Sequence, residues 1–439
     1  MLHIFNGGIV SVLSDGYNVG ILIFLVILGA MVSLMNRAGG SAAFGRWAAK
    51  RIKTRVGAQL ATTALGILIF VDDYFNCLTV GSVMRPVTDK HNVSRAKLAY
   101  LIDATAAPVC IIAPISSWAA AVASYVEDGQ GLTVFIKSIP YNFYAWLTII
   151  MMIGLAVMKI DYGPMAKFEK NAQNGDLFSG KNPYAGMEED VPEGKGRVLD
   201  LVLPIVVLVI CCVLGMLYSG NFFTGTSFVD AFSGCDASQG LMLGSAFALV
   251  FAIIYYLCRR SMSFREIMNS IPEGFKAMTD SLGATAFVDT TLRASAESFK
   301  ALLPAIVFLI GCFIAFSTGT SWGTFGILIP TVLEVFPLTD PHGVVCVSAC
   351  MAGAVCGDHC SPISDTTIMA SAGAQCDHVN HVSTQLPYAI TCAAVSCVSY
   401  IIAGFVPNAY IALPAAVVLM LGTLVVIKLI NNRRPQNDT

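Results

Sequence analysis

Hydrophobic residues are grouped along the chain into long runs that short polar segments separate. Six runs are nearly free of charged residues and have similar lengths: 18–36, 139–160, 199–219, 238–258, 384–406 and 408–430. A helix that crosses the hydrocarbon core of a bilayer needs about 20 mostly apolar residues. The pattern therefore predicts six membrane-spanning helices.

Four further runs are too long for one simple crossing, and polar, glycine or proline residues interrupt them. These runs are 56–84, with VDDYFN at 71–76; 98–126, with DATAAP at 103–108; 301–333, with STGTSWG at 317–323; and 343–376, with GDHCSPISD at 357–365. A broken backbone persists at membrane depth only where protein buries it or where it lines a wet cavity. Proline kinks are the alternative, but four polar breaks favour a transport site.

The composition supports a membrane protein. Of the 439 residues, 56% are hydrophobic and 12% are charged, whereas about 25% of the residues in a soluble chain are charged. The net charge of −2 lacks the basic excess of a nucleic-acid-binding protein. These values exclude a soluble enzyme and a disordered chain, and they predict an all-α polytopic membrane protein.

The two halves of the chain resemble each other. The segment MNRAGGSAAF at 35–44 matches MTDSLGATAF at 278–287, and APISS at 113–117 matches SPISD at 361–365. The order is the same and the offset is nearly constant, which indicates an internal repeat. We expect a first repeat, a linker, a second repeat and a tail, at 1–160, 161–198, 199–430 and 431–439.

Basic loops indicate the orientation, because they stay in the cytoplasm. The loops 37–55 and 85–97 are basic and flank run 56–84, so this run is expected to be a re-entrant hairpin that enters from the cytoplasm. Counting back from the basic C-terminal tail gives run 301–333 both ends outside. The sequence thus predicts two inverted repeats with opposed hairpins, a cytoplasmic linker and a cytoplasmic C-terminus.

The number of crossings differs between the halves. Runs 199–219 and 238–258 have no counterparts before residue 18, and no long apolar run precedes 278 in the second half. We expect a truncated fold, in which the first repeat lacks its first two helices and the second lacks one helix near 276–279. The alternative is that 262–300 forms an interfacial amphipathic stretch and one half takes a different path.

The interrupted motifs resemble those of a known family. VDDYFN, IDATAAPVCIIAPISSW, FSTGTSWGTFGILIP and GDHCSPISDTT are similar to the NhaC family of sodium/proton antiporters in the ion transporter superfamily. The resemblance implies a scaffold domain, a transport domain that moves like an elevator, and a homodimer in the plasma membrane. It implies exchange of Na⁺ for H⁺, and some members exchange small carboxylates or amino acids instead. An enzyme is not expected.

Candidate ion ligands are the acids within the interrupted runs, together with one amide: Asp72, Asp73, Asn76, Asp103, Asp358 and Asp365. Na⁺ prefers oxygen ligands, and an exchanger needs a carboxylate that binds Na⁺ or a proton but not both. Neighbouring helical residues diverge by about 100°, which favours Asp73 as the ligand and Asp72 as a cap or partner. For each acid, a structural partnership is the alternative.

Hydroxyl groups at the breaks are candidate substrate ligands: Ser116, Ser117, Thr318, Thr320, Ser321, Ser364 and Thr366. Ser116 and Ser117 are expected to be partners of Asp103 across an unwound gap. Asp365 stands where the first repeat has Ser117. This difference suggests one site that prefers a cation and a second site that is weaker or accepts an organic anion.

Histidines are candidates for proton transfer, because their side chains titrate near neutrality. His359 is expected either to relay protons beside Asp358 or to be a neutral partner of that acid. His378 and His381 are expected in a solvated cytoplasmic loop. We expect no cofactor and no metal other than Na⁺; the expected partners are Na⁺, H⁺, lipid and a small organic anion or amino acid.

Overall fold

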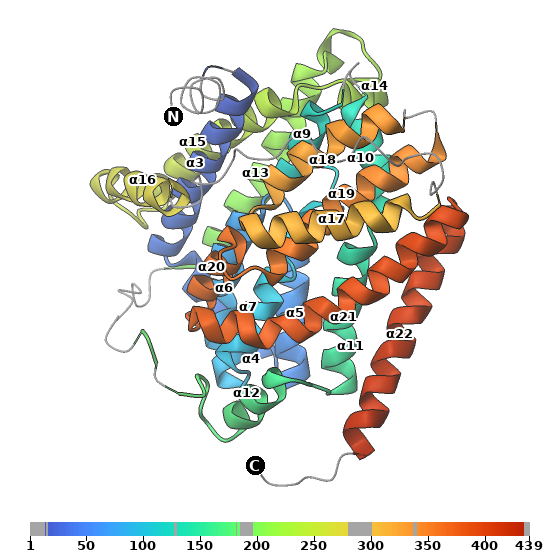
Figure 1. Ribbon diagram of the computed structural model, residues 1–439. Helices are drawn as coiled ribbons and strands as arrows, with labels where there is room; N and C mark the ends of the chain where they lie inside the picture. Colours follow the sequence, from blue (N-terminus) through green and yellow to red (C-terminus); the bar gives the residue numbers. More distant parts are fainter. Residues whose placement is uncertain are drawn as a thin grey trace, which may run out of the picture. The chain divides into compact units, whose positions relative to one another are not determined.

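The computed structural model describes residues 14, 16–126, 130–180, 182–184, 196–279, 301–336 and 340–433. These residues are mostly helical and contain no strand (Figure 1). Six helices are long and apolar enough to cross a membrane: α3 (Gly16–Arg37), α13 (Leu199–Ser219), α15 (Ala237–Cys258), α19 (Pro341–Cys360), α21 (His378–Phe405) and α22 (Ala409–Arg433). The prediction of an all-α polytopic membrane protein is confirmed.

Run 139–160 differs from the straight crossing that we expected. Its helix α11 (Phe143–Met158) has only 16 residues. It follows α10 (Gly131–Ser138) and the short 3-10 helix η2 (Ile139–Tyr141). The helical path bends by 46° at Asn142, between the segment Gly131–Tyr141 and α11. The proline in η2 explains the change, because proline lacks an N–H and restricts the residue before it.

The chain divides into two compact units. Unit 1 contains residues 1–51, 113–136 and 186–288, and unit 2 contains 52–112, 137–185 and 289–439. Besides the long helices α3, α13 and α15, unit 1 has shorter elements: α4 (Gly40–Arg51), α9 (Ser117–Ser124), η3 (Phe222–Thr224), α14 (Phe228–Ser233) and α16 (Phe264–Thr279). In its interior, the buried carboxylate of Asp200 pairs with Arg259 at 2.5 Å and accepts from the Tyr255 hydroxyl at 3.0 Å.

Unit 2 contains two helical hairpins. The first hairpin joins α5 (Arg55–Leu68) to α6 (Asp73–Lys90), and the second joins α17 (Leu303–Thr318) to α18 (Ser321–Val335). The interruption of the second hairpin, at 319–320, falls within the polar segment 317–323, and that of the first, at 69–72, overlaps the polar segment 71–76. Gly319 ends α17 in the left-handed region at φ +69°, a conformation that costs glycine little.

Unit 2 also contains the two interrupted helices that continue from the hairpins. In the first, α7 (Arg95–Asp103) is followed by α8 (Ala107–Cys110), with a proline at its start. In the second, α19 ends at Cys360 and α20 (Asp365–Ala374) begins after four residues. The linker helix α12 (Pro164–Gln173) completes the unit together with α11, α21 and α22. The two hairpins and the two interrupted helices thereby place helix ends at four polar segments of unit 2.

Two predictions of domain organisation lie partly outside the described residues. Most of the second repeat motif, at 278–287, falls in 280–300, and most of the tail, at 431–439, falls in 434–439. Helix α16 runs to Thr279, at the place where we expected a missing helix. The repeat boundaries and the truncated fold stay predictions.

Candidate ion-binding site

A buried carboxylate at the end of α7 collects donors from two other helices. Asp103 is 2% exposed, and its Oδ2 accepts hydrogen bonds from Thr367 at 3.0 Å and from Gln385 at 2.7 Å. His381 Nε2 lies 3.3 Å from the same oxygen. We call Asp103, His359, Thr367, His381 and Gln385 the Asp103 cluster. Several donors on one oxygen stabilise its charged form within an apolar interior.

The two histidines of this cluster correct two expectations. His359 does not bond to Asp358; its Nδ1 is hydrogen-bonded to the Tyr144 hydroxyl at 2.8 Å, and its Nε2 lies 3.8 Å from Asp103. Neighbouring residues on a helix point in different directions, which explains the different partner. His381 is fully buried rather than solvated, because α21 begins at residue 378 and not at 384.

A second buried carboxylate lies at the end of α19. Asp358 is 1% exposed, and its Oδ2 accepts a hydrogen bond from Ser321 at the start of α18. Its Oδ1 is also buried and accepts no hydrogen bond from the part of the chain that the structure describes. No lysine or arginine of the described residues pairs with this acid. Asp358 is therefore a buried acid with spare ligand capacity.

Asp365 links the second break to the first hairpin. Its Oδ2 accepts a hydrogen bond from the Tyr74 hydroxyl at 2.6 Å, and its Oδ1 accepts from the Thr366 backbone N–H at 2.7 Å. Helices α6 and α20 approach closely here, since a Cβ on Gly81 would lie 2.4 Å from the backbone of Gly373. Small residues permit such contacts between membrane helices.

The polar side chains Asp72, Asp73 and Asn76 at the tip of the first hairpin are fully buried. Asp72 caps α6 by accepting from the Phe75 N–H at 2.9 Å, and Asp73 is the first residue of that helix. Asn76 Nδ2 lies 2.7, 2.9 and 3.0 Å from the carbonyl oxygens of Gly66, Ile69 and Thr105, which share its two N–H groups. The Asn76 Oδ1 is buried and accepts no hydrogen bond from the described residues.

The predicted hydroxyl ligands take different positions. Thr320 and Ser364 cap α18 and α20, Ser321 bonds to Asp358, and Thr366 is bonded to Ser364 at 3.1 Å. Thr318 is exposed, and its hydroxyl donates to its own helix at Ile314. The structure thus directs one of these hydroxyls at an acid and uses others to cap helices.

Ser116 and Ser117 belong to unit 1. Ser116 caps α9, as the matched Ser364 caps α20 in the other half of the chain. Both serines are buried. The hydrogen-bond partners of Asp103 within unit 2 come from α20 and α21.

Oxygen atoms dominate the chemistry of this site. Among the described residues, no three histidine, cysteine, aspartate or glutamate side chains gather as they would around a bound metal ion. The carboxylates are instead distributed among Asp103, Asp358 and Asp365, each with hydroxyl or amide neighbours. Carboxylate, hydroxyl and amide oxygens suit a hard cation such as Na⁺.

Sequence reasoning missed three members of the Asp103 cluster, namely Thr367, His381 and Gln385. A signal was present for two of them. Gln385 follows His381 by four positions, so the two side chains share one face of a helix if the helix begins before residue 381. The capping motif that starts with Asp377, which accepts from the Asn380 N–H, marks that beginning.

This all-helical fold, with buried acids at broken helices, is that of a multi-pass membrane transporter. A model of the Na⁺/H⁺ antiporter family matches residues 122–405, and the chain belongs to this family. The protein is thus an antiporter-family transporter and not an enzyme.

Three relatives extend this comparison. An uncharacterized protein of Haemophilus influenzae is 38% identical over 88% of this chain and 79% of its own length. A second Haemophilus influenzae protein, named an uncharacterized Na⁺/H⁺ antiporter, is 32% identical over 24% of this chain and 23% of its own. The malate-2H⁺/Na⁺-lactate antiporter of Bacillus subtilis is 27% identical over 34% of each chain. Similarity to the named antiporters therefore covers a minority of each chain.

Proposed function

We propose that this protein exchanges Na⁺ for H⁺ across the plasma membrane. The observation that carries the proposal is the burial of Asp358 without a lysine or arginine partner among the described residues. An isolated buried carboxylate is costly unless a cation or a proton neutralises it. Such a group binds Na⁺ or H⁺ but not both, which is the requirement for exchange.

The surrounding groups support separate roles for two acids. Asp103 has hydrogen-bond donors from Thr367 and Gln385 and a histidine beside it. Asp358 accepts from Ser321, and its Oδ1 accepts no hydrogen bond from the residues that the structure describes. We propose Asp358 as the acid that exchanges Na⁺ for a proton. The Asp103 cluster would then hold or pass the proton.

Alternating access by an elevator movement is part of this proposal. Both hairpins and the five candidate acids Asp72, Asp73, Asp103, Asp358 and Asp365 belong to unit 2, which supports unit 2 as the transport domain and unit 1 as the scaffold. We also propose a homodimer with the C-terminus in the cytoplasm, in line with the basic loops 37–55 and 85–97.

Coupled exchange of a small carboxylate or amino acid is the second candidate. Two imidazoles, His359 and His381, lie beside Asp103 and could donate to a substrate carboxylate. The similarity to a relative that is named for malate and lactate supports the same idea. In this case, ion movement would require the organic substrate.

The test uses the full chain in proteoliposomes that contain a pH-sensitive dye. An imposed Na⁺ gradient should change the internal pH without any organic solute, and Asp358→Asn should abolish this change. Asp230→Asn, a change at an exposed acid of unit 1, is the control and should retain the activity. A pH change that appears only with malate, lactate or an amino acid would replace sodium/proton exchange with the second candidate.

A further inference from the structure

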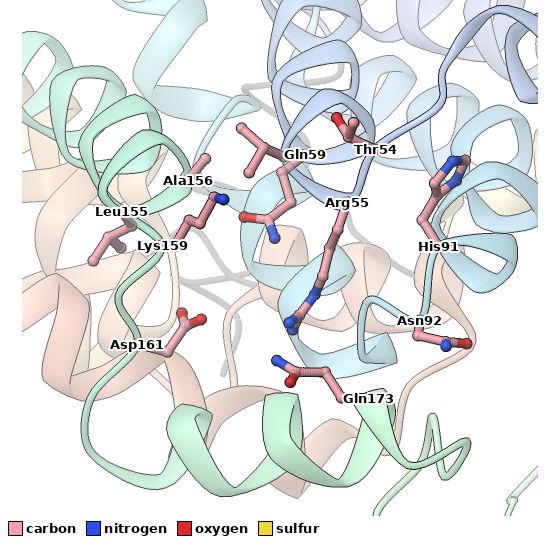
Figure 2. A pocket seen from close by; sticks show the side chains of 11 residues that line it. Thr54, Arg55, Gln59, His91, Asn92, Leu155, Ala156, Lys159, Asp161 and Gln173 are labelled. Carbon is pink, nitrogen blue, oxygen red and sulfur yellow. The ribbon is translucent and has the colours of Figure 1, made fainter.

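A cavity of about 490 Å³ lies in unit 2, away from the acids described above (Figure 2). Its walls come from the start of α5, the connection between α6 and α7, the end of α11, and α12. The sequence predicts that these segments face the cytoplasm, because the loops 37–55 and 85–97 are basic. The volume is within the usual range for small-molecule sites.

Two donors at this cavity have no acceptor among the described residues. Gln59 is 6% exposed, and among the described residues its side-chain amide forms no hydrogen bond. Figure 2 shows this amide turned into the pocket. Arg55 pairs with Glu169 through its terminal nitrogen, whereas its buried Nε has no acceptor in the described part of the chain. The Gln59 amide is therefore available to a molecule in the cavity, whereas the Arg55 Nε is a buried group without a partner in the described part of the chain.

The charged side chains around the cavity include one positive charge that no acid neutralises among the described residues. Arg55 is neutralised by Glu169, and Asp161 is neutralised by Lys97 at 2.6 Å. Lys159 also lines the cavity, is exposed, and forms no ion pair with any described residue. One uncompensated positive charge beside amide and guanidinium donors favours a small anion with oxygen acceptors.

We propose that this pocket binds a small organic carboxylate from the cytoplasm. Its oxygens would accept from the Gln59 amide and the Lys159 ammonium group. The site is separate from the Asp358 site, and the proposal does not rest on which ions are exchanged there. Lys97, which pairs with the pocket residue Asp161, precedes Asp103 on α7 by six residues, or about 9 Å of helix.

A carboxylate in this position would act on the transport site through α7. Glu169 on α12 accepts from the Ser94 N–H at 2.8 Å, at the start of α7, and pairs with Arg55 at the start of α5. A ligand that bridges Gln59 and Lys159 would join α5 to the end of α11 around this contact. The pocket would thereby make the position of α7, and of Asp103 at its other end, sensitive to internal carboxylates.

Isothermal titration calorimetry of the purified full chain in detergent tests this proposal. Succinate and lactate should bind, and inorganic phosphate at the same concentration should bind at least about tenfold more weakly. Lys159→Gln and Gln59→Leu should each weaken carboxylate binding by about tenfold, the effect of losing one hydrogen bond with a charged partner. Lys170→Gln, which alters an exposed lysine of α12 outside the pocket lining, is the matched control.

The other outcomes would overturn the proposal. Absence of carboxylate binding, or equal binding by Lys159→Gln, Gln59→Leu and the control, would show that the pocket is not the site. Tighter binding of phosphate would exclude a carboxylate as the preferred ligand. Asp358→Asn should retain carboxylate binding, and its loss there would assign the ligand to the transport site. Because this readout is binding, it is independent of sodium/proton exchange.

Discussion

In both hairpins of unit 2, a side chain caps the N-terminus of the second helix, but the capping residues differ. In the first, Asp72 caps α6; in the second, Thr320 caps α18. Each cap accepts a hydrogen bond from the backbone N–H three residues later. The first hairpin brings carboxylates and an amide to its tip, whereas the second brings hydroxyls and a glycine in the left-handed region.

Their attachments also differ. The first hairpin contacts both interrupted helices, through Asn76 to the Thr105 carbonyl and through Tyr74 to Asp365. The second contacts α19 and the break that follows, through Ser321 to Asp358 and through Gly319 beside Ile363. The first hairpin is therefore a fixed support for the site. The second packs closely on α19, where a Cβ on Gly357 would lie 2.2 Å from the Cys312 carbonyl oxygen, and Ser321 joins it to Asp358, the acid that we propose for exchange.

Removal of the Asn76 amide should have the largest effect on stability. Asn76→Ala leaves the carbonyls of Gly66, Ile69 and Thr105 without this donor, and two of them lie at the end of α5, where helical partners are lacking. Each buried unmade hydrogen bond costs about 1–3 kcal/mol. The apparent free energy of unfolding in detergent should fall by about 3 kcal/mol or more.

The matched control for this variant is in the other hairpin. Thr324→Ala removes a buried hydroxyl that donates only within its own helix, to Thr320. Its stability should change by less than about 1 kcal/mol, in line with the net value of one hydrogen bond. Similar losses for both variants would contradict the view that the first hairpin is the fixed support.

The sequence predicts the places of the breaks better than the partners across them. Asp72, Gly319 and Ser364 interrupt apolar runs, and local capping chemistry is sufficient to locate them. The contacts of Asp103 depend on how α20 and α21 pack, which no local pattern records. Hydropathy also placed the start of α21 too late, because the polar first turns that carry His381 and Gln385 lower the apolar content.

Gly319→Ala should have the next largest effect. An alanine Cβ would meet the Ile363 carbonyl oxygen at 2.7 Å, and the residue would keep an unfavourable positive φ. The left-handed conformation and the required backbone shift together cost about 2–3 kcal/mol. Thermal unfolding should show this loss, together with slower ion exchange.

Gly422→Ala is the control for this change. Nothing lies within 4 Å of a Cβ at Gly422, which is within α22. Alanine there should be neutral or should stabilise the protein by about 0.5–1 kcal/mol, because it restricts the unfolded chain. If Gly319→Ala were as stable and as active as this control, the tip of the second hairpin would not need its tight contact with the break.

Ser321→Ala should affect ion affinity rather than stability. The hydroxyl donates to Asp358, so its loss removes a charged hydrogen bond and frees the second hairpin from the acid. The apparent KM for Na⁺ should rise about tenfold, which corresponds to about 1.4 kcal/mol. Thr318→Ala, at an exposed hydroxyl of the same hairpin, should leave the KM unchanged. Equal KM values for the two variants would rule out a role for the hairpin at the acid.

The smallest effect concerns the base of the first hairpin, where Glu169 holds Arg55. Burial raises the pKa of Glu169 above its ordinary value of 4.5, as does the charge of Asp161, while Lys97, Arg55 and the Ser94 N–H oppose the rise. The folded state therefore binds this proton more tightly than the unfolded state does. Its contribution to stability is present at low pH and is lost as the pH rises above 4.5 through the folded-state value.

Thermal unfolding of the full chain at a series of pH values measures this contribution. The melting temperature of Glu169→Gln, relative to the original chain, should rise with pH over that interval, because the variant has no carboxyl to ionise. Asp176→Asn, at an exposed acid of the linker, should follow the original chain. A constant difference between Glu169→Gln and the original chain would mean that Arg55 fully compensates the buried charge. The first hairpin would then be held at its base in a way that does not depend on pH.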